Sequence, residues 1–519
     1  MQNMRKFIAK VVALVCLFIL PPTAFAQLPE PTYGWNLGNT LEPPCGEGCW
    51  GGTASQALIN AVADAGFNTI RIPVAWDSHA NQSTYQIDSA WMARVKQVVD
   101  WSIARNMTVV INSHWDNGWV DNYMNSVNST TNAKLNSYWT QIANTFKNYD
   151  NRVIFAGMNE PPVDNASQMS VLFTYQQTFI SAVRNTGGNN VTRWLAVQGP
   201  STDIDKTYNL MYTLPYDPTA NRLIVEVHYY SPWEFALLDS GNMFYFWGQG
   251  YHHATMTNRN ATWGEEDYIE AEFQKMKQKF VDQGVPVMIG EFSVERRDDA
   301  VKYPDLTGTA LDLHLASRTY YYRTLLDAAK RNGLKPINWS TTGGLFNFST
   351  AAVVDPNSIR PLTGGAALPP PGGGGIIANG MYRLTPRHSG KALEVASVGI
   401  TDGSNVQQWS YWWGDSQRWM LTHLGNNQYS VISAKSGKAL DVSGWGTGDG
   451  TNVDIWAYGA GANQKWTVSD GGGGYYRLSP THASSKCLDV SGASTADGAN
   501  VQIWSCGTNT NQQWSFQSP

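Results

Sequence analysis

The chain carries little charge for its length, and the balance is slightly acidic. Its 519 residues include 36 lysines and arginines against 41 aspartates and glutamates, a net charge of −5, and charged residues make up only 15% of the total. This balance offers no basic surface for nucleic acid or for an anionic membrane. We therefore expect neither nucleic acid nor a membrane among its partners.

Long apolar runs are also scarce. The run Val11–Leu20 is too short to cross a bilayer, and no later segment is long enough. It follows three basic residues and precedes the small-residue sequence Ala24-Phe25-Ala26, an order typical of a secretory signal peptide. Residues 1–26 are therefore predicted to be a removed leader, and the mature protein to be secreted.

Cysteines are few, and their spacing favours disulfides over a metal site. Cys16 lies in the leader, and the other four form two local pairs, Cys45 with Cys49 and Cys487 with Cys506. In an exported protein such pairs favour disulfides, and no further cysteine or histidine stands at zinc-ligand spacing. We expect two disulfides and no metal.

Aromatic residues are abundant by contrast, with 22 tryptophans and 24 tyrosines. Their rings can stack on the faces of sugars while a polar edge stays in water, although many such rings belong to protein cores. A break in composition divides them into two regions: a proline run and then a glycine run occupy residues 368–376. This segment is typical of a linker, and it predicts one domain over residues 27–367 and a second over 377–519.

The first region alternates apolar, strand-like runs with amphipathic, helix-like stretches. This alternation predicts right-handed βα units and a (β/α)₈ barrel, since eight strands are expected. A doubly wound open sheet is the alternative, but the turn at residues 34–39 lacks its glycine spacing. The expected strands are Tyr33–Leu37, Thr69–Val74, Thr108–Asn112, Val153–Met158, Trp194–Gln198, Leu223–Val227, Val287–Ile289 and Pro336–Trp339.

The expected helices fill the gaps between these strands. The pattern is weakest after Gln198 and after Trp339, where few apolar residues recur at helical spacing. The predicted helices are Ser55–Ala65, Ser89–Ala104, Asn132–Phe146, Met169–Asn185, Glu265–Asp282 and Leu311–Asn332.

The second region contains an internal repeat. Gln-x-Trp triplets end at Trp419, Trp466 and Trp514, 47 and 48 residues apart, and a Leu-x-Val triplet precedes each. The units consist of short alternating strands separated by Gly, Asn and Asp turns. Residues 377–519 thus resemble a ricin-type β-trefoil, a lectin-like carbohydrate-binding module.

Two glutamates in the first region follow short apolar runs directly. Glu160 comes after Val153–Met158, and Glu291 comes two residues after the strand expected at Val287–Ile289. Carboxyl ends of barrel strands meet at the face where barrel enzymes keep their chemistry. Two carboxylates there can flank one glycosidic bond, and we therefore expect a glycoside hydrolase.

Several motifs in this region occur in the order found in glycoside hydrolase family 5, and the resemblance to its secreted endo-β-1,4-glucanases covers roughly residues 31–342. Each block falls at an expected strand end. The blocks are Gly34-Trp35-Asn36-Leu37-Gly38-Asn39-Thr40-Leu41-Glu42, Thr69-Ile70-Arg71-Ile72-Pro73, Asn112-Ser113-His114-Trp115, Asn159-Glu160-Pro161, His228-Tyr229-Tyr230, Gly290-Glu291-Phe292 and Asn338-Trp339.

This resemblance implies a role for each matching residue. Glu160 would be the general acid/base and Glu291 the nucleophile of a retaining mechanism, with the two carboxyl groups about 5–5.5 Å apart. Both roles are filled by carboxylates, so no cofactor is expected. The residues expected to bind substrate or to support the two carboxylates are Arg71, His114, Asn159, His228, Tyr230 and Trp339.

The trefoil resemblance implies sugar pockets, each with an acidic residue, an aromatic ring and an amide. The third repeat offers Asp489, Gln502, Trp504 and Asn511, and the second offers Asp441, Trp456 and Asn463, with Asp454 where glutamine is usual. The first repeat departs further, because Glu394 and Ser416 replace the usual Asp and Asn. Whether the first repeat forms a sugar pocket is therefore left undecided.

These features together predict a secreted, monomeric, retaining endo-β-1,4-glucanase that acts on cellulose and related β-glucans. A β-mannanase, a xyloglucanase or another β-glycanase on the same barrel stays open, and so does an exo-acting enzyme. A polysaccharide-binding lectin with an inactive barrel is the alternative from another class, and the intact pair Glu160 and Glu291 argues against it.

Overall fold

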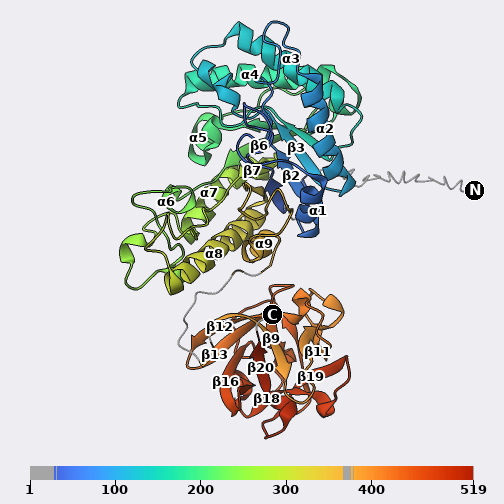
Figure 1. Ribbon diagram of the computed structural model, residues 1–519, viewed down its shortest axis with the longest axis vertical. Coiled ribbons are helices and arrows are strands. Elements are labelled where there is room, and N and C mark those ends of the chain that lie inside the picture. Colours follow the sequence, from blue (N-terminus) through green and yellow to red (C-terminus); the bar gives the residue numbers. More distant parts are fainter. Residues whose placement is uncertain (1–27, 31, 366, 368–375, 378, 518–519) are drawn as a thin grey trace, which may run out of the picture.

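The structure is a computed structural model that describes residues 28–30, 32–365, 367, 376–377 and 379–517 (Figure 1). The predicted leader and nearly all of the predicted linker lie outside the described residues. Within them, Figure 1 shows two groups of elements: helices around a central set of strands, and a second group made of strands. No helix of the described part is long and apolar enough to cross a membrane.

The first group is a closed barrel of eight parallel strands, each hydrogen-bonded to the next in chain order and β8 to β1. The predicted (β/α)₈ architecture is confirmed, and all eight strands lie where they were expected. They are β1 Gly34–Asn36, β2 Thr69–Ile72, β3 Thr108–Asn112, β4 Val153–Ala156, β5 Leu195–Gln198, β6 Leu223–His228, β7 Val287–Glu291 and β8 Leu334–Asn338.

The helices pack outside the strands, and side-chain caps set where several of them begin. The Ser55 hydroxyl accepts the Leu58 N–H, and the Asn128 side chain accepts the Thr131 N–H, so α3 begins three residues before the predicted start. The helices are α1 Gln56–Asp64, α2 Ser89–Ala104, α3 Ser129–Thr145, α4 Ala166–Asn185, α5 Ile204–Leu210, α6 Trp233–Ala236, α7 Glu266–Lys279, α8 Gly308–Asn332 and α9 Pro356–Leu362.

Strand alternation sorts the barrel residues into two cores. One set, including Val109, Ile111 and Val225, packs against the helices, and the other, including Val110, Ile224 and Met288, forms a separate buried cluster that fills the barrel. Strands β6 and β7 run one and two residues further than expected, to His228 and Glu291. The register between them shifts after Val227, which places His228 opposite Glu291.

The second group is a twelve-stranded antiparallel structure built from three four-stranded repeats, as a β-trefoil requires. Its strands are β9 Gly380–Pro386, β10 Ala392–Val395, β11 Ser404–Trp409, β12 Trp419–Gly425, β13 Gln428–Ser433, β14 Ala439–Val442, β15 Thr451–Trp456, β16 Lys465–Gly472, β17 Tyr475–Pro480, β18 Lys486–Val490, β19 Ala499–Ser505 and β20 Trp514–Gln517.

The sequence repeat of this region is its structural symmetry. The three triplet tryptophans are fully buried, and each indole N–H donates to the backbone carbonyl of the leucine in the preceding Leu-x-Val, at 2.9–3.0 Å. Asn405, Asn452 and Asn500 join the repeats through a closed ring of three amide hydrogen bonds, each 2.9 Å long. Both predicted disulfides are present, Cys45–Cys49 and Cys487–Cys506.

Candidate active site

Polar side chains gather at the carboxyl ends of the barrel strands. Arg71 lies in β2, His228 ends β6 and Glu291 ends β7. His114 follows β3, Glu160 follows β4 and Trp339 follows β8. Parallel strands end at one face of the barrel, so residues from six strands are brought into one place.

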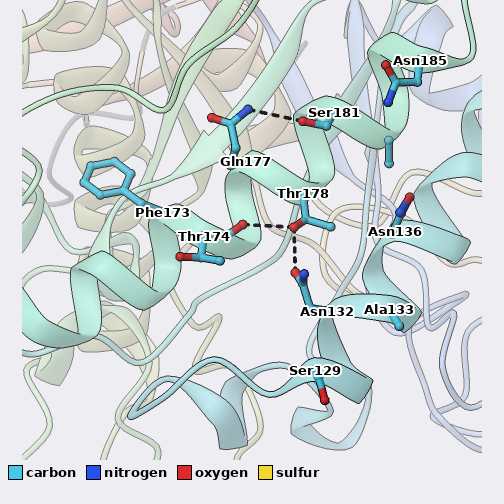
Figure 2. Close-up of a pocket in the computed structure, with 11 residues that line it drawn as sticks. Ser129, Asn132, Ala133, Asn136, Phe173, Thr174, Gln177, Thr178, Ser181 and Asn185 are labelled. Carbon is cyan, nitrogen blue, oxygen red and sulfur yellow. Dashed lines mark hydrogen bonds between the residues drawn. The ribbon is translucent and has the colours of Figure 1, made fainter.

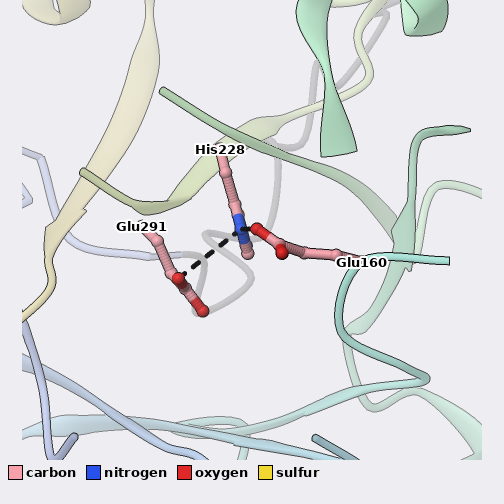
Figure 3. Close-up of side chains that lie close together, drawn as sticks. All are labelled: Glu160, His228 and Glu291. Atoms are coloured by element: carbon pink, nitrogen blue, oxygen red, sulfur yellow. Dashed lines mark hydrogen bonds and ion pairs between the residues drawn. The ribbon is translucent and has the colours of Figure 1, made fainter. Parts of the chain in front are cut away.

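Glu160 and Glu291 both point toward the ring of His228 (Figure 3). The Nδ1 atom of His228 lies 2.6 Å from Oε1 of Glu160 and 3.7 Å from Oε2 of Glu291. One oxygen of each carboxyl group and this nitrogen all lie within 4.8 Å of one another. The two glutamates predicted to share the chemistry therefore converge on one point.

Glu291 is buried and held from two sides. Arg71 donates to its Oε1 at 2.8 Å, and the Tyr230 hydroxyl donates to its Oε2 at 3.0 Å. Burial raises the pKa of the Glu291 carboxyl, and the charges of His228 and Arg71 oppose that rise. The second amino group of Arg71 donates to Asn159 at 2.9 Å, which fixes that amide beside Glu160.

Glu160 differs from Glu291 in its exposure. Its side chain is 45% exposed, whereas that of Glu291 is 8% exposed. Burial of its inner part raises the pKa of Glu160, but the hydrogen bond to His228 and the charge of that ring outweigh this and hold the pKa below its usual value. A carboxyl group that is open on one face can reach a bound molecule.

The carboxylates around His228 favour the protonated form of its ring. Burial lowers its pKa, but the surrounding carboxylates of Glu291, Glu160 and Glu226 raise it to about 10. His114 behaves in the opposite way: burial and the nearby charge of Arg71 lower its pKa far below the usual range, so the ring is neutral. The His114 ring stacks on Trp339, with ring centroids 5.8 Å apart and planes 10° apart.

Two cavities are lined by residues of this site. One of about 250 Å³ is lined by Glu160, Tyr230 and the exposed rings of Trp233 and Trp263. Another of about 330 Å³ is lined by Trp339 and by the loop that follows β8. Each cavity thus combines an aromatic ring with polar groups, as a site for a sugar chain needs.

A larger hollow of about 650 Å³ lies away from this face, between α3 and α4 (Figure 2). Its eleven lining residues are Ser, Thr, Asn, Gln, Ala and Phe, and Thr178 donates to Asn132 across it at 2.7 Å. No lining residue is an acid or a base at neutral pH, so nothing in the lining would activate its serine and threonine hydroxyls as nucleophiles.

Glu160, His228 and Glu291 are residue types that can also bind a metal ion, and theirs is the one such group found in the described part of the chain. Their contacts argue against that use. Glu291 already accepts from Arg71 and Tyr230, and Nδ1 of His228 already bonds to Glu160. A cation here would also face the Arg71 guanidinium at close range.

The third trefoil repeat forms a pocket from the residues predicted for it. Asp489, Gln502, Trp504 and Asn511 line a cavity of about 460 Å³. Gln502 and Asn511 donate to the two oxygens of Asp489 at 3.1 and 2.8 Å, and the Trp504 ring is exposed. An oriented carboxylate beside an open ring is suited to sugar hydroxyls and to the apolar face of a sugar.

Residues 36–344 match the family model described as cellulase, glycosyl hydrolase family 5. The chain belongs to this family. Residues 375–456 and 462–519 match the ricin-type β-trefoil lectin domain. The predicted recognition of both regions is confirmed, and the chain is a glycoside hydrolase.

Among its relatives, this family 5 hydrolase is 35% identical to endoglucanase A of Paenibacillus barcinonensis over 64% of this chain and 87% of that protein. It is 34% identical to a xyloglucan-specific endo-β-1,4-glucanase of Bacteroides ovatus over 64% and 68%. A solved xyloglucan-specific β-1,4-glucanase from a ruminal metagenomic library, in complex with XXLG, has a TM-score of 0.59 and 38% identity, and covers 64% of this chain and 93% of that one.

The structure of this hydrolase brings all eight predicted barrel residues to one face. It also adds residues that sequence reasoning did not assign. Trp263 lies in the segment between α6 and α7, where no periodicity marks it. Glu226 lies inside the barrel, and an acidic residue within an apolar strand was its only signal.

The second trefoil repeat of the hydrolase differs from the third in charge. Asp441 accepts from Asn463 at 2.8 Å, but Asp454 stands across the strand pair where the third repeat has Gln502. Both carboxyl groups are buried, and burial together with the charge of Asp454 raises the pKa of Asp441 to about 6. Repeat two therefore lacks the amide donor that Gln502 provides in repeat three.

In the first repeat, the side chain of Trp412 occupies the position of the sugar pocket. Trp412 donates its indole N–H to Oε2 of Glu394 at 2.9 Å, and Gln417 donates to the same oxygen at 2.6 Å. The backbone N–H at this position bonds to the triplet glutamine in every repeat, but the other two repeats have Gly459 and Gly507 there. The sequence signal for this filling was the tryptophan in place of glycine.

Proposed function

We propose that this family 5 hydrolase is a retaining endo-β-1,4-glucanase with Glu160 as acid/base and Glu291 as nucleophile. The observation that carries the proposal is that one oxygen of each carboxyl group lies within 4.8 Å of the other beside His228. Retaining enzymes place the pair about 5–5.5 Å apart, whereas inverting enzymes leave about 6.5–9.5 Å for a water molecule. The close approach favours double displacement.

In the first step, a carboxylate oxygen of Glu291 bonds to the anomeric carbon while the bond to the leaving oxygen breaks. Glu160 gives its proton to that oxygen, so the leaving sugar departs as an alcohol. In the second step, Glu160 takes a proton from water, whose oxygen displaces Glu291. Two inversions leave the configuration at the anomeric carbon unchanged.

The surrounding residues would serve these two steps. Arg71 and Tyr230 hold Glu291 in position for attack and stabilise its negative charge. Asn159, oriented by Arg71, is placed to bind the sugar 2-hydroxyl, a contact that strengthens in the transition state. Trp339 offers a stacking face, and the neutral His114 beside it can donate to or accept from a sugar hydroxyl.

Glu160 must hold a proton when the bond breaks, although His228 lowers its pKa in the free protein. A glycan lying over the exposed face of Glu160 would remove water from it. Desolvation disfavours a carboxylate and raises its pKa. Substrate binding would thus shift the proton of the His228–Glu160 pair toward Glu160, so that Glu160 holds a proton when the substrate is bound.

An endo mode is supported by the presence of two cavities, one lined by Glu160 and one by Trp339, because a chain must extend in two directions from the bond that is cut. Xyloglucan is the second candidate substrate. Two relatives described above are xyloglucan-specific by name, at 34% and 38% identity. A backbone of β-1,4-linked glucose is common to both candidates.

The remaining parts of the chain support action outside the cell. We propose residues 1–26 as a leader, 27–367 as the catalytic domain, 368–376 as the linker and 377–519 as the binding module of a monomer. The third-repeat pocket, with Asp489, Gln502, Trp504 and Asn511, is the proposed carbohydrate site of that module. Such binding would keep the enzyme near a polysaccharide.

A substrate panel tests the proposal. Carboxymethyl cellulose, lichenan, xyloglucan, xylan and mannan are each incubated with the full chain, and reducing ends and viscosity are followed together. We expect cleavage of the glucose-based polymers, with viscosity falling faster than reducing ends rise. Cleavage of mannan or xylan alone would refute the glucanase assignment, and cleavage of none would favour a binding protein.

A further inference from the structure

Glu226 is a fully buried carboxylate inside the barrel, next to the site but without a route to substrate. It lies in β6, two residues before His228 on the same side of the strand, and its side chain has no exposed surface. Bringing a carboxylate into a barrel interior costs free energy unless partners compensate for it. The partners therefore indicate what the residue does.

Three side chains face Glu226. Arg71 forms an ion pair with its Oε1 through Nε at 3.0 Å, and Gln198 donates to its Oε2 at 2.6 Å. The Nε2 atom of His228 lies 3.5 Å from Oε1, at the outer limit of a hydrogen bond. Glu226 thus contacts both cations of the site from behind, on the side away from the cleft.

The backbone makes room for this carboxylate. A Cβ atom added at Gly290 would lie 2.1 Å from Oε1 of Glu226. Real Cβ contacts are never this close, so any larger residue at this position would displace the Glu226 carboxylate. Gly290 directly precedes Glu291. The absence of a side chain at this position therefore leaves room for the Glu226 carboxylate next to the nucleophile.

We infer that Glu226 is a positioning residue that acts through His228: its carboxylate faces Nε2 of the ring, turns Nδ1 toward Glu160, and keeps on the His228–Glu160 pair the proton that hydrolysis uses. The inference rests on the acid/base role proposed for Glu160. It makes Glu226, His228 and Glu160 a chain in which one nitrogen of the ring is fixed so that the other can exchange a proton.

The charges around His228 support this order. With Glu226 ionised, the ring has a negative group at each nitrogen, and these carboxylates raise the pKa of His228 to about 10. Loss of the Glu226 charge would lower the proton affinity of the ring and of the pair it forms with Glu160. The other ionisable groups that face the site are Glu291, Arg71, Tyr230, His114, Asp121 and Glu42.

The contact with Arg71 suggests a competing explanation, in which Glu226 merely holds the guanidinium beside Glu291. The two explanations differ in what they do to the kinetics. Arg71 stays charged at all working pH values, so a defect transmitted through it would reach the pH profile only through the ionisation of Glu291, on the acidic limb, and would leave the basic limb in place. It would also slow attack by Glu291 on every substrate, whatever its leaving group.

The test is Glu226→Gln in the full chain, with kcat/KM measured across pH on a cello-oligosaccharide and on 2,4-dinitrophenyl cellobioside. The dinitrophenolate leaves without protonation, so this substrate bypasses Glu160 in the first step. We expect the basic limb of the cello-oligosaccharide profile to move to lower pH by about one unit, as one lost neighbouring charge would cause. The activated substrate should keep kcat/KM within a few-fold of the wild type.

Two further variants make the result decisive. Glu226→Asp keeps the charge, so its basic limb should lie near that of the wild type even where its rate is lower. Asp217→Asn removes a buried carboxylate from another arginine pair, with Arg184, and should leave the profile unchanged. The inference is overturned if the basic limb of the Glu226→Gln profile does not move, or if the variant loses equal activity on both substrates. Neither result would affect the proposed function, which depends on hydrolysis by the wild type.

Discussion

The barrel and the trefoil build their binding sites in opposite ways. The barrel site joins residues from six strands, and Arg71 reaches Glu291 across 220 residues of sequence. Each trefoil pocket comes from one repeat, as Asn511 and Asp489 show at a separation of 22 residues. The barrel therefore has a single site whose residues depend on one another. The trefoil has three copies of its pocket position, and each copy can change separately.

This difference has consequences for substitution. In the barrel, each group holds the next, so one change should affect the whole reaction. In the trefoil, the third repeat keeps an open pocket, the second has a second buried carboxylate, and the first is filled by Trp412. A change in one repeat should leave the others as they were, because each core tryptophan bonds within its own repeat.

The largest effect is expected from Glu291→Ala. Without a nucleophile the first step cannot occur, so hydrolysis should fall by at least about 10⁴-fold. Added azide should restore some turnover and give a glycosyl azide of inverted configuration, which NMR of the product identifies. Retention of the wild-type rate would disprove the role of Glu291 and, with it, the single interlocked site.

Glu160→Ala should have the next largest effect, and one that depends on the substrate. Loss of general acid catalysis should lower kcat/KM on cello-oligosaccharides by about 10²–10⁴-fold. Dinitrophenyl cellobioside should be nearly spared in kcat/KM, because its leaving group needs no proton. An equal loss on both substrates would mean that Glu160 does not act as the acid.

Asp489→Ala should weaken carbohydrate binding by the trefoil and leave hydrolysis of short soluble substrates unchanged. Loss of charge-assisted hydrogen bonds should weaken binding about tenfold or more, as measured by affinity electrophoresis in xylan, galactan and β-glucan gels. Glu394→Ala in the filled first repeat is the matched control and should migrate like the wild type. A larger loss in the control would show that repeat one is the working pocket.

The smallest effect is expected from Asp454→Gln, which makes repeat two resemble repeat three. The raised pKa of Asp441 means that the folded protein loses stability as pH rises from about 4 through 6, where ionisation beside Asp454 is disfavoured. Removing that neighbour should raise Tm by about 2 °C at pH 7 and hardly at all at pH 4. Equal Tm changes at both pH values would contradict the coupling of the two carboxyl groups.

Much of this arrangement could be predicted because its signals are local. Short runs of three to six residues located all eight barrel strands, and the Gln-x-Trp triplets located the three buried tryptophans of the trefoil. Caps were less visible: α3 begins at Ser129 because Asn128 caps it, before its apolar residues recur. The helix predicted from those residues therefore began three residues late.

Sequence alone determined the classes of element, the repeat, and the two glutamates that follow buried strands, because each depends on neighbouring residues. Only the tertiary structure decided that Glu226 faces Arg71 and His228, that Gly290 makes room for it, and that Trp412 occupies the first trefoil pocket. Those contacts depend on the closing of a barrel and the turn of a loop. The sequence gives the type of each ionisable residue, but the pKa of that residue depends on the groups that folding places beside it.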